Sequence, residues 1–178
     1  MKFSPHIECD KEEIQTLFTQ TFSASDGAAE GEQVGRLARR LMDDTEAEKV
    51  FGFVATERGN IIGCIFFTPL TFDSPINACL LSPVAVSTKH QSQGIGQQLI
   101  RFGIEQMGQQ GVELIFTYGD PNYYSKVGFK PVSQQVARAP FELSYPEGWL
   151  GLSLAGAAMN RLPGRAGCVE AFDDPALW

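Results

Sequence analysis

Histidine and positive charge are scarce in this sequence, and each shortage excludes a class of protein. The 178 residues include 2 histidines and carry a formal net charge of −7. Nucleic-acid binding depends on a basic field that displaces counterions from phosphates, so an acidic chain is a poor candidate for it. A zinc hydrolase needs clustered ligands, whereas His6 and His90 stand far apart in the sequence. We therefore expect no nucleic-acid partner and no metal.

Long apolar runs and paired cysteines are also missing. The longest apolar run, Ile61 to Phe67, is far too short to cross a bilayer. The start from Met1 to Cys9 lacks the apolar core of a signal peptide. The cysteines at positions 9, 64, 79 and 168 form no CxxC pair. These absences predict a cytoplasmic protein with reduced thiols and no membrane partner.

The composition suits a folded domain. Hydrophobic residues make up 43% of the chain, enough for a core without disulfides or a metal. The chain contains neither a Gly-x-Ser-x-Gly elbow nor a Gly-Lys-(Ser/Thr) loop, which disfavours serine hydrolases and P-loop enzymes. A nucleophile pair of Cys79 and His90 is conceivable, but no local signature supports it.

The N-terminal part predicts two helices. Apolar residues recur at helical spacing from Cys9 to Phe22, with Asp10 as N-cap and Glu13 as its capping-box partner. The small, polar stretch Ser23–Gly31 reads as a loop. A second helix is expected over Glu32–Met42, where one face is apolar.

The pattern then changes to strands. Val50–Thr56 and Ile61–Phe72 are rich in β-branched and aromatic residues, with a tight turn at Arg58-Gly59-Asn60 between them. A third strand is expected over Asn77–Val86. Pro83 interrupts it, and because proline cannot donate to a ladder, we expect a bulge or a splayed sheet there.

The next elements complete a strand–helix–strand unit. A helix is expected from Gly94 or Gly96 to the closing glycine Gly111, followed by a strand over Val112–Tyr118. The strands on either side of this helix should be parallel, with a right-handed connection. A short helix from Asp120 through Lys126 and a strand opening at Phe129 come next. The fold class is thus α/β with a mixed sheet.

The last part of the chain is broken by prolines. One strand is expected there, over Leu150–Leu154. We expect residues 1–131 to form the core and residues 132–178 to add strands and loops that complete the same domain, because the aromatic residues of the tail need burial. These residues are Phe141, Tyr145, Trp149, Phe172 and Trp178.

The stretch from Leu81 to Leu99 carries the chemistry. It runs from a strand through a polar loop and the glycines Gly94 and Gly96 into a helix. Glycines let backbone N–H groups turn toward a common point, and a helix N-terminus adds unpaired donors and partial positive charge. No acidic residue occurs between Val84 and Ile104. This combination predicts a pyrophosphate site, although a glycine pair can also serve close helix packing.

Two motifs resemble the GNAT superfamily of acyltransferases. Gln91-x-x-Gly94-x-Gly96 resembles its (Arg/Gln)-x-x-Gly-x-(Gly/Ala) signature, with glutamine where many members have arginine. The segment Tyr124-Ser-Lys-Val-Gly128-Phe129 resembles its Tyr-x-x-x-Gly-Phe element. The wider sequence is similar to the bacterial YhbS-like branch. The resemblance implies the acyl-CoA N-acyltransferase fold, a central, mostly antiparallel sheet with a splayed parallel pair around the coenzyme A (CoA) site.

The resemblance also implies roles for individual residues. Tyr124 would be the general acid that protonates the departing CoA thiolate; a core tyrosine whose hydroxyl caps a carbonyl is the alternative. Asn122 could bridge to the pantetheine amides. The remaining donor contacts would come from Val84, Ala85 and Val86 for the pantetheine and thioester, and from Gln91, Ser92, Gln93, Gly94, Ile95, Gly96 and Gln97 for the diphosphate.

The general base is the least defined part of the site. Asn77–Val86 contains no acid, although some GNAT members carry a glutamate on the corresponding strand. Glu32 is the weak candidate here, with Asp120, Asp26 and Glu30 as further possibilities. Each of these carboxylates could equally be a helix cap or a solvated charge.

Together these residues predict an N-acetyltransferase. It would move an acetyl or other acyl group from acetyl-CoA, as co-substrate, to an amine of a small molecule or peptide. The alternative is a CoA- or acyl-CoA-binding sensor without turnover. A monomer or a homodimer is expected. Neither the acceptor nor the preferred acyl chain length follows from the sequence.

Overall fold

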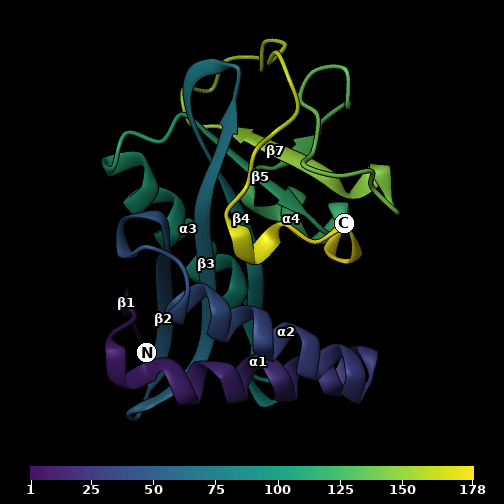
Figure 1. Ribbon diagram of the computed structural model, residues 1–178. Coiled ribbons are helices and arrows are strands. Elements are labelled where there is room, and N and C mark those ends of the chain that lie inside the picture. The colour runs from purple at the N-terminus through teal and green to yellow at the C-terminus, as the bar shows by residue number, and fades with distance from the viewer. The chain divides into compact units, whose positions relative to one another are not determined.

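A seven-stranded mixed sheet runs through the computed structural model, which describes all residues from Met1 to Trp178 (Figure 1). Its strand order is β1-β2-β3-β4-β5-β7-β6. The parallel pair of β4 and β5 within this sheet confirms the predicted α/β class. None of the helices has the length and apolar composition that a membrane span requires.

By its internal contacts the chain divides into two units. The first comprises Met1–Phe66 and Pro83–Gly103, and the second comprises Phe67–Ser82 and Ile104–Trp178. Three elements continue from one unit into the other: β3 (Asn60–Phe72), β4 (Ser74–Val86) and α3 (Ile95–Gln109). Single-turn 3-10 helices occupy Glu8–Asp10, Ala47–Lys49, Thr88–His90, Ser125–Val127, Pro146–Gly148, Glu170–Phe172 and Pro175–Leu177.

The first unit contains the predicted hairpin. Strand β2 (Phe51–Glu57) is followed by β3 after a turn in which Arg58 and Gly59 have φ of 50° and 83°. Positive φ at both central residues is the type I′ geometry that suits the twist of a hairpin. A strand that periodicity did not predict, β1 (Lys2–Pro5), pairs antiparallel with β2.

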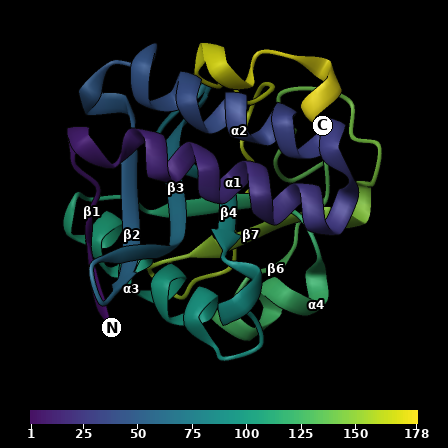
Figure 2. The ribbon, with the colours of Figure 1, turned by 90° about the horizontal axis from the view of Figure 1, so that it is seen from below.

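Helices α1 (Lys11–Asp26) and α2 (Ala28–Asp43) lie side by side in the first unit (Figures 1 and 2). The predicted loop over Ser23–Gly31 is wrong, because only Gly27, with φ of 96°, separates the two helices. Close packing explains the difference. A Cβ at Gly31 would lie 2.5 Å from the carbonyl oxygen of Thr19, so the missing side chain lets α2 approach α1.

The expected capping box at the start of α1 is also wrong. The Asp10 side chain makes no bond to an amide of this helix and accepts instead from the N–H of Ile7, at 2.8 Å. The Glu13 carboxylate accepts from the N–H of Ile61, at 2.7 Å. Glu13, which the local pattern assigned to the helix cap, therefore bonds instead to a residue 48 positions away in the sequence.

The first unit packs helices against both faces of its strands. On one face, Phe18 of α1 stacks on Phe66 of β3, with ring centroids 5.9 Å apart. On the other face, Phe102 of α3 contacts Phe53 of β2, with centroids 5.6 Å apart, and a Cβ at Gly63 would lie 3.3 Å from Leu99. Side chains alternate between the two faces along a strand. Gly63 and Phe66 are an odd number of positions apart, so they lie on opposite faces and contact different helices.

The second unit contains the predicted strand–helix–strand pairing. Strand β5 (Leu114–Tyr118) is parallel to β4 through Ala78–Leu80 and antiparallel to β7 (Trp149–Ser153). Strand β6 (Lys130–Pro131) pairs with β7, and the short helix α4 (Pro121–Tyr124) follows β5. Gly111 has φ of 81° where α3 ends, as expected of a closing glycine.

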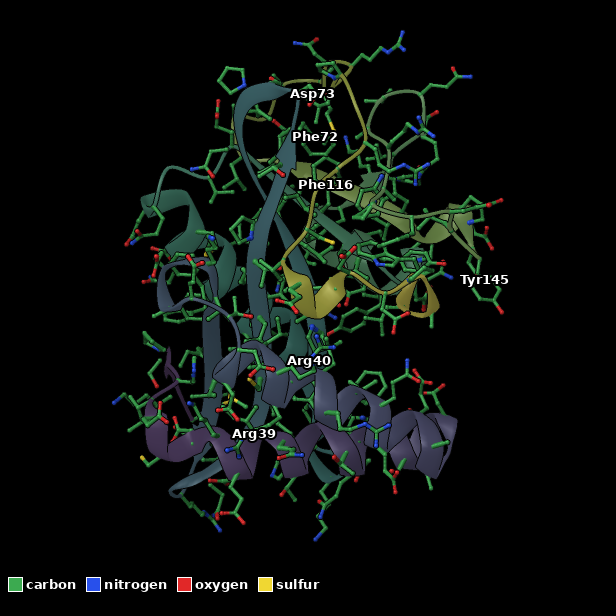
Figure 3. All side chains as sticks on the ribbon, viewed as in Figure 1. Arg39, Arg40, Phe72, Asp73, Phe116 and Tyr145 are labelled. Carbon is green, nitrogen blue, oxygen red and sulfur yellow. The ribbon has the colours of Figure 1, made fainter.

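An aromatic cluster fills the core of the second unit. Phe116 stacks on Trp149 at 5.2 Å and lies 5.7 Å from Phe72, a neighbour visible in Figure 3. Trp178 packs against Trp149 at 6.1 Å. The predicted burial of the tail aromatics is wrong for Tyr145, which is 68% exposed and points away from the ribbon in Figure 3.

Candidate functional site

At the end of β4, the backbone N–H and C=O groups on one edge of the strand face β3, and those on the opposite edge do not. The N–H of Ser87 donates to the carbonyl of Ile62 in β3, at 2.8 Å. Backbone N–H and C=O groups point to alternate edges along a strand. The groups of Ala85 therefore point toward β3 like those of Ser87, and the groups of Val84 and Val86 point to the opposite edge. The Val86 carbonyl already accepts from Gln91 Nε2 at 3.0 Å and from Thr21 Oγ1 at 3.5 Å.

The loop after β4 is folded on itself. The His90 N–H donates to the Ser87 carbonyl at 2.8 Å, and Gln93 Nε2 donates to the Lys89 carbonyl at 3.3 Å. Ser92 and Gly94 both have positive φ, 61° and 76°. A left-handed backbone conformation costs little free energy at glycine but is strained at serine. The surrounding structure therefore holds Ser92 in a conformation that serine rarely adopts.

This loop leads directly into the N-terminus of α3. The first intrahelical bond runs from the Gln98 N–H to the Gly94 carbonyl, at 3.1 Å. The N–H groups of Ile95, Gly96 and Gln97 therefore precede the helical ladder and lie at its positive end. The Ile95 side chain is buried, 6% exposed, and anchors this turn. Such a turn can hold an anionic phosphate group.

An acidic residue from elsewhere in the chain lies beside this loop, although the loop's own sequence contains none. His90 Nε2 lies 3.8 Å from a carboxylate oxygen of Glu57, at the end of β2. His90 Nδ1 lies 3.4 Å from the Ser87 hydroxyl. A carboxylate from another strand therefore faces the one histidine of the loop, which the local charge pattern did not indicate.

In the second unit, α4 presents the predicted tyrosine. Asp120 is its N-cap and accepts from the N–H of Asn122 at 2.9 Å, so this carboxylate serves as a cap. Asn122 is exposed. Gly128, with φ of 98°, ends the following turn as expected.

The Tyr124 ring is held from several sides. Phe129 meets it edge-on with centroids 5.8 Å apart, and Tyr123 does so at 5.1 Å. A Cβ at Gly119 would lie 2.7 Å from the ring, so this glycine leaves room for it. Burial raises the pKa of Tyr124 to about 12, against the effect of a side-chain hydrogen bond to Thr117. The phenol thus keeps its proton at neutral pH.

Apart from Asp120, the candidate bases lie on α1 and α2. Glu32 is exposed and forms an ion pair with Arg36, with 3.5 Å between Oε2 and Nη1. Asp26 accepts from the Ser25 hydroxyl at the end of α1, and Glu30 lies in the first turn of α2. No three histidine, cysteine, aspartate or glutamate side chains gather in a way that could hold a metal ion.

Comparison with known proteins gives the family. The model of the acetyltransferase (GNAT) domain matches residues 48–131. The uncharacterised N-acetyltransferase YjhQ of Escherichia coli strain K12 is 30% identical over 184 residues, which cover 98% of this chain and 97% of YjhQ. The chain belongs to the GNAT N-acetyltransferase family. GNAT enzymes are acyltransferases that use acetyl-CoA as co-substrate.

Solved GNAT structures share the whole fold. The GNAT enzyme YhbS of Escherichia coli, in complex with CoA, has a TM-score of 0.84 at 25% identity and covers 97% of this chain and 92% of its own. A GNAT acetyltransferase of Brucella melitensis, in complex with acetyl-CoA, has a TM-score of 0.75 at 25% identity, with 97% of both chains covered. The predicted resemblance to the YhbS-like branch is confirmed.

Sequence reasoning missed three polar or small residues of this GNAT chain. Thr117 and Thr21 lie within strand and helix patterns where a threonine carries no distinct signal, and only their bonds to Leu81 and Val86 reveal them. Gly119 could have been noticed, because a glycine between a buried strand and a helix cap often marks a close approach.

A separate cavity of about 430 Å³ lies in the second unit, along β6 and β7. It contains none of the predicted GNAT site residues. Its lining includes Lys130, Val132, Ser133, Gly151, Ser153 and Met159.

Proposed function

We propose that this chain transfers an acetyl or other acyl group from acetyl-CoA to an amine of a small molecule or peptide. One observation carries the proposal: the loop with positive φ at Ser92 and Gly94 opens into the unpaired amides at the start of α3. Such amides, at the positive end of a helix, suit a diphosphate. The family membership supports the same donor.

The donor would lie along β4 and the loop. Its diphosphate would bind the backbone of Gln91–Gln97. The pantetheine amides would pair with Val84 and with the N–H of Val86, since the Val86 carbonyl already has two donors. Ala85, between these two residues, would lie beside the pantetheine. Asn122 would offer its side-chain amide to the pantetheine amides.

The reaction would be direct attack by the neutral amine on the thioester carbonyl. The C–N bond forms, the C–S bond breaks, and Tyr124 gives its proton to the thiolate. The amine proton leaves to a base, for which Glu32 is the candidate, and then to solvent. Support for Tyr124 comes from its fixed ring and retained proton.

Calorimetric titration with CoA, followed by an amine and peptide screen, tests the proposal. CoA release is best followed chromatographically, because the exposed Cys9 would react with a thiol reagent. We expect Tyr124→Phe to lower kcat about 100-fold, the usual scale for a general acid, with CoA affinity unchanged. Tyr123→Phe is the matched control and should stay near the wild-type rate.

Each outcome separates the alternatives. A wild-type protein that gives no heat with CoA contradicts the proposal as a whole. Binding of CoA without acetylation of any amine favours a sensor without turnover. An unchanged kcat in Tyr124→Phe rules out the general-acid role and leaves donor binding intact.

A further inference from the structure

Thr117 is buried in the second unit, between β4 and the candidate acid. Its side chain is 1% exposed, and its hydroxyl donates to the Leu81 carbonyl at 2.8 Å. Leu81 is one position beyond Leu80, the last β4 residue in register with β5. Tyr124 is close enough to Thr117 that a side-chain hydrogen bond between them lowers the pKa of the phenol, against the larger effect of burial. One hydroxyl therefore links the candidate acid to the β4 backbone.

The ring of Tyr124 has little freedom to leave this hydroxyl. It lies against Gly119, two residues after Thr117 on the same chain segment, where even a methyl group would come within 2.7 Å. Phe129 closes another side of the ring at 5.8 Å. The position of the phenol oxygen is thus set by β5 and the turn that follows it.

The hydrogen-bonding capacity of a hydroxyl defines the states of this link. A threonine hydroxyl has one hydrogen to donate and two lone pairs. While its hydrogen is on the Leu81 carbonyl, Thr117 can only accept from the Tyr124 O–H. Once Tyr124 has lost its proton, the phenolate can only accept, and the Thr117 hydrogen can rotate from Leu81 to it.

That second state reduces an energetic cost of the proton transfer. The pKa of Tyr124, about 12, exceeds the value of about 8.5 for an ordinary thiol. Proton transfer from the phenol to a thiolate is therefore unfavourable. The hydrogen bond with Thr117 already lowers this pKa against the effect of burial, so without Thr117 the transfer would cost more. A hydrogen bond to a charged group is among the stronger ones in proteins.

We infer that Thr117 is the positioning residue of Tyr124, orienting the phenol before transfer and donating to the phenolate after it. This rests on the proposed general-acid role of Tyr124. In the step, the Tyr124 O–H bond breaks, an S–H bond forms on CoA, and the phenolate stays hydrogen-bonded to Thr117 until solvent returns its proton.

The test compares Thr117→Val with Thr117→Ser in the full chain. Hydroxylamine, a small neutral nucleophile, serves as acceptor if the amine screen yields nothing better, with the rate without enzyme subtracted. We expect Thr117→Val to lower kcat about 10-fold or more, the effect of losing one hydrogen bond to a charged group. KM for acetyl-CoA should change less than about twofold and the serine variant should recover most of kcat.

The chain provides a matched control. Thr68 of β3 is also fully buried, 0% exposed, but its hydroxyl has no hydrogen-bond partner. Thr68→Val makes the same chemical change and should leave kcat unchanged. If Thr117→Val proves unstable in thermal melts, Thr117→Cys keeps a similar volume with a weaker donor and should lie between wild type and the loss expected for valine.

A double-mutant cycle distinguishes this inference from the proposed function. In a Tyr124→Phe background, Thr117→Val should cause no further loss of kcat. An equal loss in both backgrounds would overturn the inference, because Thr117 would then act independently of Tyr124. So would an unchanged kcat in Thr117→Val alone. A Tyr124→Phe variant with wild-type activity would instead remove the general-acid role on which the inference rests.

Discussion

The Gln91 side chain donates from Nε2 to the carbonyl of Val86, 3.0 Å away. This bond closes the loop between the end of β4 and the start of α3. Many GNAT members have arginine at this position. In this chain the glutamine side chain forms a hydrogen bond with the protein's own backbone. Its amide shapes the loop whose N–H groups are proposed to hold the diphosphate.

Gln91→Glu should weaken CoA binding. The carboxylate cannot donate to Val86, and it adds a negative charge beside the proposed phosphate site. We expect the Kd for CoA, measured by calorimetry, to rise about 10-fold, which corresponds to about 1.4 kcal/mol. Gln110→Glu, an exposed position just beyond α3, introduces the same charge and should leave the Kd within about twofold. Equal effects of the two variants would contradict the assigned role of Gln91.

Alkaline pH should destabilise the protein partly through Tyr124. Its pKa is raised from 10.0 to about 12 by burial, so the folded state holds this proton more tightly than the unfolded state does. The stabilisation is fully present below about pH 10 and is lost as pH rises through about 12. Between pH 9 and 11.5, we expect Tm to fall more for wild type than for Tyr124→Phe. Parallel curves would show that Tyr124 titrates normally, as an exposed phenol does.

Two helix glycines should respond to alanine with opposite sign. At Gly31 a Cβ would meet the Thr19 carbonyl at 2.5 Å and the Ser23 hydroxyl oxygen at 1.9 Å. The resulting overpacking outweighs the helix propensity of alanine, and urea unfolding should show a loss of about 1–2 kcal/mol. At Gly108 a Cβ would lie 3.5 Å from Leu154, an ordinary contact, so Gly108→Ala should gain about 0.5–1 kcal/mol. Stabilisation by both substitutions would mean that α1 and α2 pack less closely than described.

Local patterns predicted most elements of the fold. The hairpin turn at Arg58-Gly59, the closing glycine of α3 and the capped helix α4 depend on residues near in sequence, and the structure confirms them. The strand β1 was missed because 4 residues are too few to show a period. The loop between α1 and α2 was predicted wrongly, because small polar residues favour a loop until a partner helix packs against them.

The sequence by itself determined where a phosphate-binding turn could form. Gly94 permits positive φ, and a helix that begins directly after it must leave its first amides without intrahelical partners. Tertiary structure decided which side chains face that turn and which face the candidate acid. Glu57 reaches His90 from β2, and Thr117 joins Leu81 to Tyr124, through contacts between residues up to 36 positions apart. A hydrogen bond between distant residues depends on how strands pair and pack, and no local periodicity records it.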